Sequence, residues 1–168
     1  MLGSEYYRGF LSRQGQAFYD CINTQLLRKD YSGKTTFSIS NPETSVSDCF
    51  LAYKALRDDH PEFFYLGFQT EFTRRGGIGT LEYPILYTPE IIDRIWQQVR
   101  KKICQIVRGS ADLSMIERET LIYERIARSI AYTNNGDVRD HSIVGPVLLS
   151  TGVCEGKNAL LLLCFRRI

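Results

Sequence analysis

The sequence predicts a mostly helical α+β fold, in which a helical N-terminal region carries one β-hairpin and a second helical part follows. Apolar residues recur at helical spacing in several stretches, and the period changes to two only between about residues 63 and 87. The 168 residues are 43% hydrophobic and 24% charged, which is ordinary for a globular protein with a buried core. We therefore expect a helical region with the hairpin over 1–110 and a second part over 111–168.

Two helices are expected ahead of the hairpin. Apolar residues between Phe10 and Leu27 are spaced as one face of a helix, which predicts a helix over about 10–28. The same spacing predicts a second helix over about 46–58. The polar segment 30–42 between them is interpreted as a connection without regular structure.

The hairpin is predicted from a change of period. Apolar and polar residues alternate over 64–72, as in a half-buried strand. Arg74–Gly77 has the composition of a turn, and 78–87 form a second extended run in which Pro84 is best suited to an edge. A β-hairpin over about 63–87 follows.

The remaining helices have recognisable ends. Pro89 stands at the first position of a long helix, where its missing N–H costs nothing, and Gly109 stops that helix. Ser114 and Glu117 have the spacing of a capping box, in which each side chain satisfies the other residue's free backbone N–H. Apolar residues then continue at helical spacing as far as Ile130.

Composition excludes several classes of function. The 21 basic and 19 acidic residues give a net charge of +2, which is too balanced to indicate a nucleic-acid partner. No window approaches the ~18 apolar residues of a membrane span, and no signal peptide is visible at the N-terminus. The five irregularly spaced cysteines indicate neither a disulfide framework nor a zinc site, and nothing calls for a metal or an organic cofactor. We expect a cytoplasmic chain as it stands, or an extracellular or cell-surface one if a targeting segment precedes it.

One cysteine is placed differently from the other four. Cys154 lies where a glycine-bearing loop, TGVCEG, turns into an apolar helix. Free backbone N–H groups at a helix start stabilise a thiolate, and they could also hold an oxyanion. Gly152 and Gly156 leave space for a substrate backbone. From these features alone, a nucleophile and a buried structural cysteine remain equal alternatives. The others lie within predicted helices and are expected to be buried: Cys21, Cys49, Cys104 and Cys164.

Four segments resemble the bacterial transglutaminase-like superfamily. The nucleophile motif of that family is similar to GVCEG at 152–156, and the helix that precedes it is similar to YERIARSIAY at 123–132. HSIVG at 141–145 occupies the loop before the nucleophile, and DDHPEFFY at 58–65 resembles a stretch of the family's helical N-terminal region. The resemblance implies a papain-like α+β fold, of which 111–168 would be the N-terminal helical half without most of the sheet.

The resemblance also implies a chemistry. Cys154 would attack the carbonyl of a protein or peptide substrate, form a thioester, and be released by an amine or by water. Glu155 and His141, with the two flanking glycines, are the candidates for the surroundings of substrate or oxyanion. The family's histidine and aspartate follow the nucleophile, whereas only 14 residues follow Cys154 and both histidines, His60 and His141, precede it. We therefore expect a front part of such a protein that is inactive alone, with His141 a loop or packing residue.

Two further expectations concern partners. Leu160–Phe165 is apolar all round, so without a covering sheet the last helix should expose a patch that favours a homo-oligomer. The alternatives to an acyltransferase or peptidase-like protein are a non-catalytic interaction module of the same fold and an unrelated helical protein with a buried Cys154.

Overall fold

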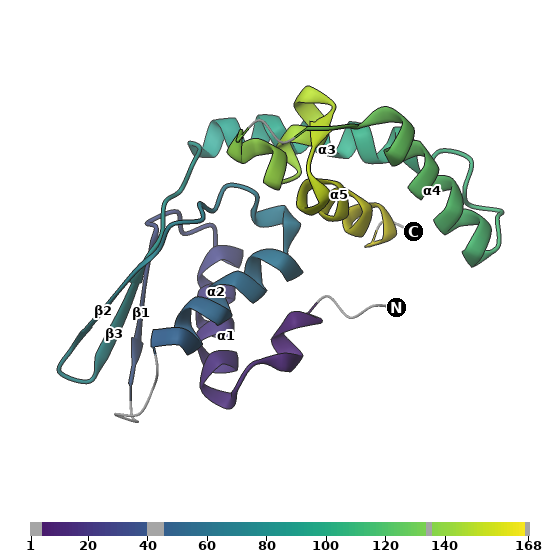
Figure 1. The fold of residues 1–168 in the computed structure, drawn as a ribbon. Helices are drawn as coiled ribbons and strands as arrows, with labels where there is room; N and C mark the ends of the chain where they lie inside the picture. The colour runs from purple at the N-terminus through teal and green to yellow at the C-terminus, as the bar shows by residue number, and fades with distance from the viewer. Residues whose placement is uncertain (1–4, 40–45, 134–135, 167–168) are drawn as a thin grey trace. The chain divides into compact units, whose positions relative to one another are not determined.

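The computed structural model describes residues 5–39, 46–133 and 136–166, and it confirms a mostly helical α+β fold (Figure 1). The chain divides into two compact units, Met1–Pro89 and Glu90–Ile168. This boundary falls before the long helix that follows the hairpin, whereas the expected division lay at 110/111. Among the described residues, no helix combines the length and the apolar character that a membrane crossing requires.

Two packed helices form the centre of the first unit. Helix α1 (Arg13–Leu27) begins at Ser12, whose side chain accepts a hydrogen bond from the Gly15 N–H at 3.0 Å, and it packs against α2 (Val46–Asp59). Both lie where the sequence predicted helices. The predicted inner faces were too wide, because several of their apolar side chains are exposed: Phe10, Leu27 and Phe50. The buried faces of the two helices consist of Phe18, Tyr19, Ile22, Leu26, Cys49, Tyr53 and Leu56.

The hairpin belongs to a three-stranded antiparallel sheet with the order β1-β3-β2. Strands β2 (Glu71–Arg75) and β3 (Ile78–Glu82) are joined by Gly76 and Gly77, both at positive φ, as a tight hairpin turn requires. The prediction of a strand over 64–72 was wrong in its first part. Pro61–Phe63 form a 3-10 helix, and Phe64 to Leu66 are all buried instead of alternating.

Strand β1 (Lys34–Ser38) lies in the segment that was expected to be a connection. It pairs along the whole of β3, from Lys34 opposite Glu82 to Ser38 opposite Ile78. Gly79 makes the pairing possible, because a Cβ there would meet the Phe37 ring at 2.8 Å. The strand is therefore specified by a long-range partner, and the local sequence gives little sign of it.

The second unit is mainly helical. Helical spacing predicts one apolar stripe on helix α3 (Pro89–Ile106), and all of its members except the half-buried Trp96 are buried: Ile92, Ile95, Val99, Ile103 and Ile106. Helix α4 (Met115–Ser129) begins with the predicted capping box of Ser114 and Glu117. Two short strands, β4 (Ala131–Tyr132) and β5 (Thr151–Gly152), pair in parallel. Between them in the sequence lie a 3-10 helix (Val138–His141) and a π-helical turn (Gly145–Leu149). Helix α5 (Cys154–Arg166) follows β5.

Candidate nucleophile site at the start of helix α5

Cys154 is the first residue of α5, and it is exposed to solvent. The chain reaches it through β5 and Val153, whose carbonyl accepts the Lys157 N–H at 3.1 Å and so begins the helix. The N–H groups of the first turn, those of residues 154–156 included, have no acceptor in a preceding turn. The sulfur thus belongs to a residue at the positive end of the helix, where an anion is stabilised.

The remaining cysteines provide an internal comparison. Cys49 and Cys164 are buried as expected, and burial raises the pKa of each thiol to about 12. Cys21 is half-buried, and burial raises its pKa too. The expectation for Cys104 was wrong, because this thiol is exposed near the end of α3, next to the buried stripe residue Ile103. The molecule therefore presents two exposed thiols at opposite kinds of helix end.

His141 is in contact with the helix that Cys154 opens. Its Nδ1 lies 2.5 Å from Oε2 of Glu155, the residue after the cysteine. One step earlier in the loop, the Asp140 carbonyl accepts the Val153 N–H at 3.2 Å. These two bonds join residues 140–141 to the residues on either side of Cys154. A carboxylate that accepts from Nδ1–H leaves Nε2 as the basic nitrogen of the ring.

The glycines of the motif serve close packing of the chain against itself. A Cβ at Gly156 would lie 2.3 Å from the Asp140 carbonyl oxygen and 2.8 Å from that of Ser142. A Cβ at Gly152 would lie 3.0 Å from a carbon of the Pro146 ring. The space expected for a substrate backbone at Gly156 is therefore taken by the chain's own loop, which this glycine allows to approach α5.

Asp137 and Asp140 lie in a loop whose composition predicts solvated or turn-forming aspartates, and for Asp140 this prediction was wrong. Its side chain is buried, with Oδ1 accepting from the Thr151 hydroxyl at 2.7 Å, while Oδ2 has no hydrogen-bond partner among the described residues. Asp137 does form the expected turn, because its carboxylate accepts the Arg139 N–H at 2.9 Å. Nothing in the local pattern of residues distinguishes the two aspartates, since both lie in one polar loop.

Other candidate chemistry is sparse in this part of the chain. Among the described residues, no three His, Cys, Asp or Glu side chains form a group that could hold a metal ion. His60, to which the sequence assigned no catalytic role, is buried in the first unit with its Nδ1 2.7 Å from Glu62 Oε1.

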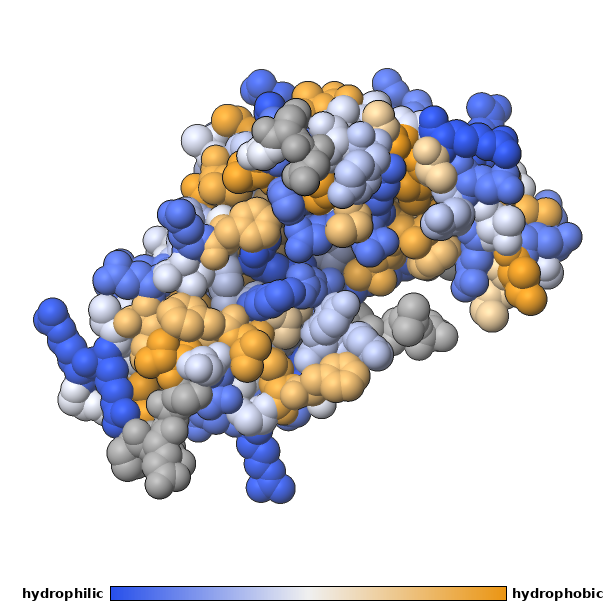
Figure 2. Space-filling view, viewed as in Figure 1, coloured by the Kyte–Doolittle hydropathy of each residue, from blue (hydrophilic) through white to orange (hydrophobic). Residues whose placement is uncertain are grey.

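The apolar surface differs from the one expected for α5. Leu160 and Leu163 are buried, and no large apolar side chain of the described α5 residues is exposed. In the second unit the most exposed aliphatic side chains lie at the start of α4, where Met115 and Ile116 are 73% and 74% exposed. Other exposed apolar side chains of this unit are Ile91, Tyr123, Tyr132, Val138, Leu148 and Leu149. On the face drawn in Figure 2, apolar and charged residues are interspersed, and one apolar group emerges where α4 begins, at the lower right. The homo-oligomer stays a prediction, without the patch that motivated it.

No family model matches the chain, and a search of curated proteins finds no match to it. The resemblance to the transglutaminase-like superfamily therefore rests on the sequence motifs.

Proposed function

We propose that this protein is a transglutaminase-like cysteine acyltransferase or peptidase-like protein with Cys154 as its nucleophile. The observation that carries the proposal is the position of an exposed thiol on the first residue of α5. A thiolate there is stabilised by the free N–H groups of the first turn, and the same groups are suited to an oxyanion.

The chain was expected to be inactive alone, with His141 a loop or packing residue, because no histidine follows Cys154. The contact of His141 with Glu155 instead supports a base on the N-terminal side of the nucleophile. Glu155 holds Nδ1 of His141, as the aspartate of a catalytic triad holds its histidine, so Nε2 can take a proton. In the proposed reaction, His141 takes the thiol proton and the thiolate sulfur bonds to the substrate carbonyl carbon. When the carbon–nitrogen bond breaks, the leaving amine receives that proton and a thioester remains on Cys154.

Thiol labelling tests the nucleophile, with Cys104 as its control within the same chain. Iodoacetamide labelling followed by peptide mass spectrometry should modify Cys154 about two- to fivefold faster than Cys104 at neutral pH, because one thiol lies at the positive and the other near the negative end of a helix. Both thiols are exposed, so access does not explain such a difference. Equal rates at the two cysteines would contradict an activated Cys154.

An activated ester tests the base. Incubation with p-nitrophenyl acetate should place a thioester on Cys154, and His141→Gln should slow its formation by about 100-fold if the imidazole acts as general base. Glu155→Gln should slow it less, because the histidine remains. A His141→Gln protein that acylates at the wild-type rate would leave Cys154 as a nucleophile and remove His141 from the mechanism.

A non-catalytic interaction module of the same fold is the second candidate, and the exposed apolar residues at the start of α4 favour it. Immobilised wild-type, Cys154→Ala and Ile116→Glu proteins distinguish the two. If the protein is an interaction module, the Cys154→Ala protein should capture the same partner as wild type, and the Ile116→Glu protein should not capture it. Light scattering over a range of concentrations tests whether that partner is a second copy of this chain.

A further inference from the structure

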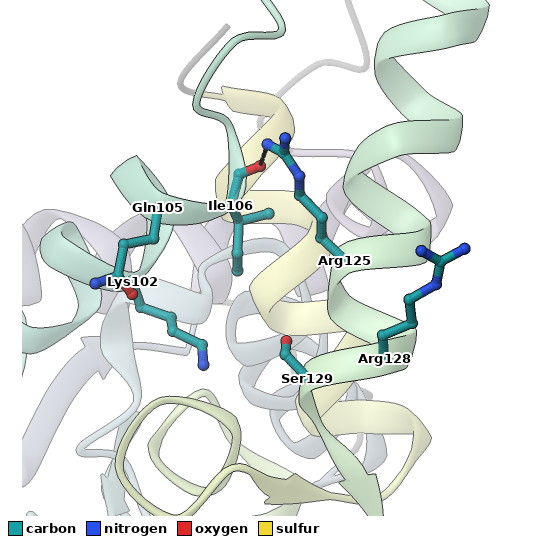
Figure 3. Close-up of a pocket in the computed structure, with 6 residues that line it drawn as sticks. All are labelled: Lys102, Gln105, Ile106, Arg125, Arg128 and Ser129. Carbon is teal, nitrogen blue, oxygen red and sulfur yellow. Dashed lines mark hydrogen bonds between the residues drawn. The ribbon is translucent and has the colours of Figure 1, made fainter.

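A cavity of about 310 Å³ lies in the second unit, between the later turns of α3 and α4. The residues that line it carry positive charge or polar groups around one apolar side chain: Lys102, Gln105, Ile106, Arg125, Arg128 and Ser129. Figure 3 shows Lys102 and Gln105 on α3 and the arginines and Ser129 on α4, with Lys102 extending into the space between the helices. None of these residues takes part in the Cys154 site described above.

The three cations are not equivalent. Arg125 donates through Nη1 to the carbonyl oxygens of Ile106 and Arg108, both at 2.6 Å, so it holds the end of α3. Arg128 donates to Glu124 at 2.9 Å, and in Figure 3 it is turned away from Lys102. The ammonium group of Lys102 forms no hydrogen bond or ion pair with another residue in the part of the chain that the structure describes. Lys102 is therefore the cation whose donors are available.

The net charge around the cavity remains positive after the nearby negative groups are subtracted. The carbonyl ends of α3 and α4 each contribute about half a negative charge, and Arg125 already donates to the last carbonyl of α3, that of Ile106. Glu124 neutralises one further cation. An excess of about one positive charge is left for three cationic side chains.

The walls of the cavity are suited to the apolar part of a small ligand. Ile106 is buried and forms part of the lining, and the methylene stems of Lys102, Arg125 and Arg128 add apolar surface beneath their charged ends. Gln105 and Ser129 supply neutral polar groups at the edge. The volume lies at the lower end of the range for small-molecule pockets, which suits a ligand the size of one ring with a head group.

We propose that this cavity binds a small organic phosphate, with Lys102 as the direct contact to the phosphoryl oxygens. A doubly charged head gains more from the excess positive charge at the cavity than a single carboxylate charge does. A lysine ammonium contacts phosphate as a point charge without the geometric demands of arginine.

Titration of the full chain with phenyl phosphate at low ionic strength tests the site, with binding followed by calorimetry and by backbone amide shifts. Binding should saturate and shift amides of α3 and α4. Benzoate should bind more weakly, and benzyl alcohol, which keeps the ring without the charge, should not bind measurably. Lys102→Gln should weaken binding about tenfold, the effect of removing a charge-assisted hydrogen bond.

Lys101→Gln is the matched control, because it removes the same charge from an exposed neighbour that does not line the cavity. Its affinity should stay within about twofold of wild type, since surface charges contribute little to a specific contact. Lys102→Arg should restore part of the affinity, and denaturation midpoints of all three variants show whether they fold.

Three outcomes overturn the proposal. Equal losses in Lys101→Gln and Lys102→Gln would indicate general attraction by the helix surface. Binding of benzyl alcohol as tight as that of phenyl phosphate would indicate an apolar cavity only. Absence of saturation would remove the site altogether. Cys154→Ala should leave binding unchanged, so failure here and failure of the acyl-transfer proposal are separate results.

Discussion

Each unit contains one aspartate–histidine neighbour pair, Asp59-His60 and Asp140-His141, and the two pairs are used differently. Both aspartates are 2% exposed, and both histidines lie against a glutamate. In the first unit the glutamate is two residues further along the chain, at Glu62. In the second it is Glu155, which lies on the helix that Cys154 opens.

The surroundings of the two aspartates differ most. Asp59 Oδ1 accepts the Tyr7 N–H at 2.9 Å, and its Oδ2 accepts the Arg8 N–H at 3.0 Å and the Tyr19 hydroxyl at 3.1 Å. Burial and the nearby Asp59 charge raise the pKa of Tyr19, so its hydroxyl stays a donor. Asp140 has one side-chain partner, Thr151, and its second oxygen is unpaired among the described residues.

The difference indicates which pair is structural. A buried carboxylate with three donors ties the N-terminal segment and α1 to the end of α2, and its neighbour His60 is enclosed. A buried carboxylate with one donor is held at some cost in stability, and its neighbour His141 is partly exposed and contacts Glu155, the residue after the candidate nucleophile. Each pair contains one buried polar atom without a partner among the described residues, His60 Nε2 in the first and Asp140 Oδ2 in the second. The number of donors to the aspartate and the exposure of the histidine therefore distinguish the two pairs.

The same substitution in the two pairs should give the largest contrast. Asp59→Asn should lower the free energy of unfolding by about 3 kcal/mol, because it replaces one oxygen with an NH₂ group that faces existing donors. Asp140→Asn should stay within about 1 kcal/mol of wild type, because Oδ1 can still accept from Thr151 and a buried charge is removed.

Urea denaturation measures both effects, with a separate probe for each unit. Trp96, the one tryptophan of the chain, lies on α3 and reports on the second unit by fluorescence. Near-ultraviolet tyrosine circular dichroism reports on Tyr19 and its neighbours in the first. Equal losses in the free energy of unfolding would show that Asp140 is held as firmly as Asp59, and would contradict the proposed difference between the two pairs.

A glycine substitution gives the next largest effect and tests the approach of the His141 loop to α5. Gly156→Ala should destabilise the second unit by about 2 kcal/mol, because the added methyl would overlap the Asp140 and Ser142 carbonyls. Within an exposed helix the same change normally stabilises by up to about 1 kcal/mol, so the predicted sign is reversed.

Gly9→Ala in the first unit is the control, since a Cβ there meets nothing within 4 Å. It should change the unfolding free energy by less than about 1 kcal/mol. Trp96 fluorescence during denaturation measures Gly156→Ala, and the ring proton shifts of His141 show whether the loop has moved. A more stable Gly156→Ala protein would contradict the close packing.

The helices were predictable because their signals are local. The stripe of α3, the capping box at Ser114 and the start of α5 at Cys154 all lie within a few turns of sequence. Strand β1 was missed because its pairing with β3 connects residues 40 to 48 positions apart, from Ser38 with Ile78 to Lys34 with Glu82. Cys104 was assigned to the core because helical periodicity does not locate the edge of a buried stripe more exactly than about one residue, and Cys104 directly follows a buried residue of that stripe.

The candidate site was predictable only in part for the same reason. A glycine-flanked cysteine at a helix start is visible in the sequence, and so is a histidine in the preceding loop. The pairing of His141 with Glu155 depends on a loop folding back over α5, which Gly156 permits through a contact with the carbonyl of Asp140. That contact, like the burial of Asp140 itself, has no periodic signature.

The smallest expected effect compares the exposed Asp30 with the half-buried Asp137, each of which closes a turn two residues further on. In the first unit Asp30 accepts the Ser32 N–H at 2.9 Å, and in the second Asp137 accepts the Arg139 N–H at 2.9 Å. Hydrogen bonds from the Arg139 guanidinium, and then from its backbone N–H, lower the pKa of Asp137 to about 2. Hydrogen bonds from Ser32 lower the pKa of Asp30 as well.

Because both carboxyl pKa values are lower in the folded state, both turns should stabilise the fold above about pH 4, the ordinary value for aspartate, and lose that contribution as the pH falls. The turn at Asp137 should persist to the lower pH, near 2. Carboxyl carbon shifts in a pH titration measure the two residues separately. Arg139→Gln should raise the pKa of Asp137 toward its ordinary value and leave that of Asp30 unchanged, and added salt should act in the same direction on Asp137 alone, because only this turn contains an ion pair.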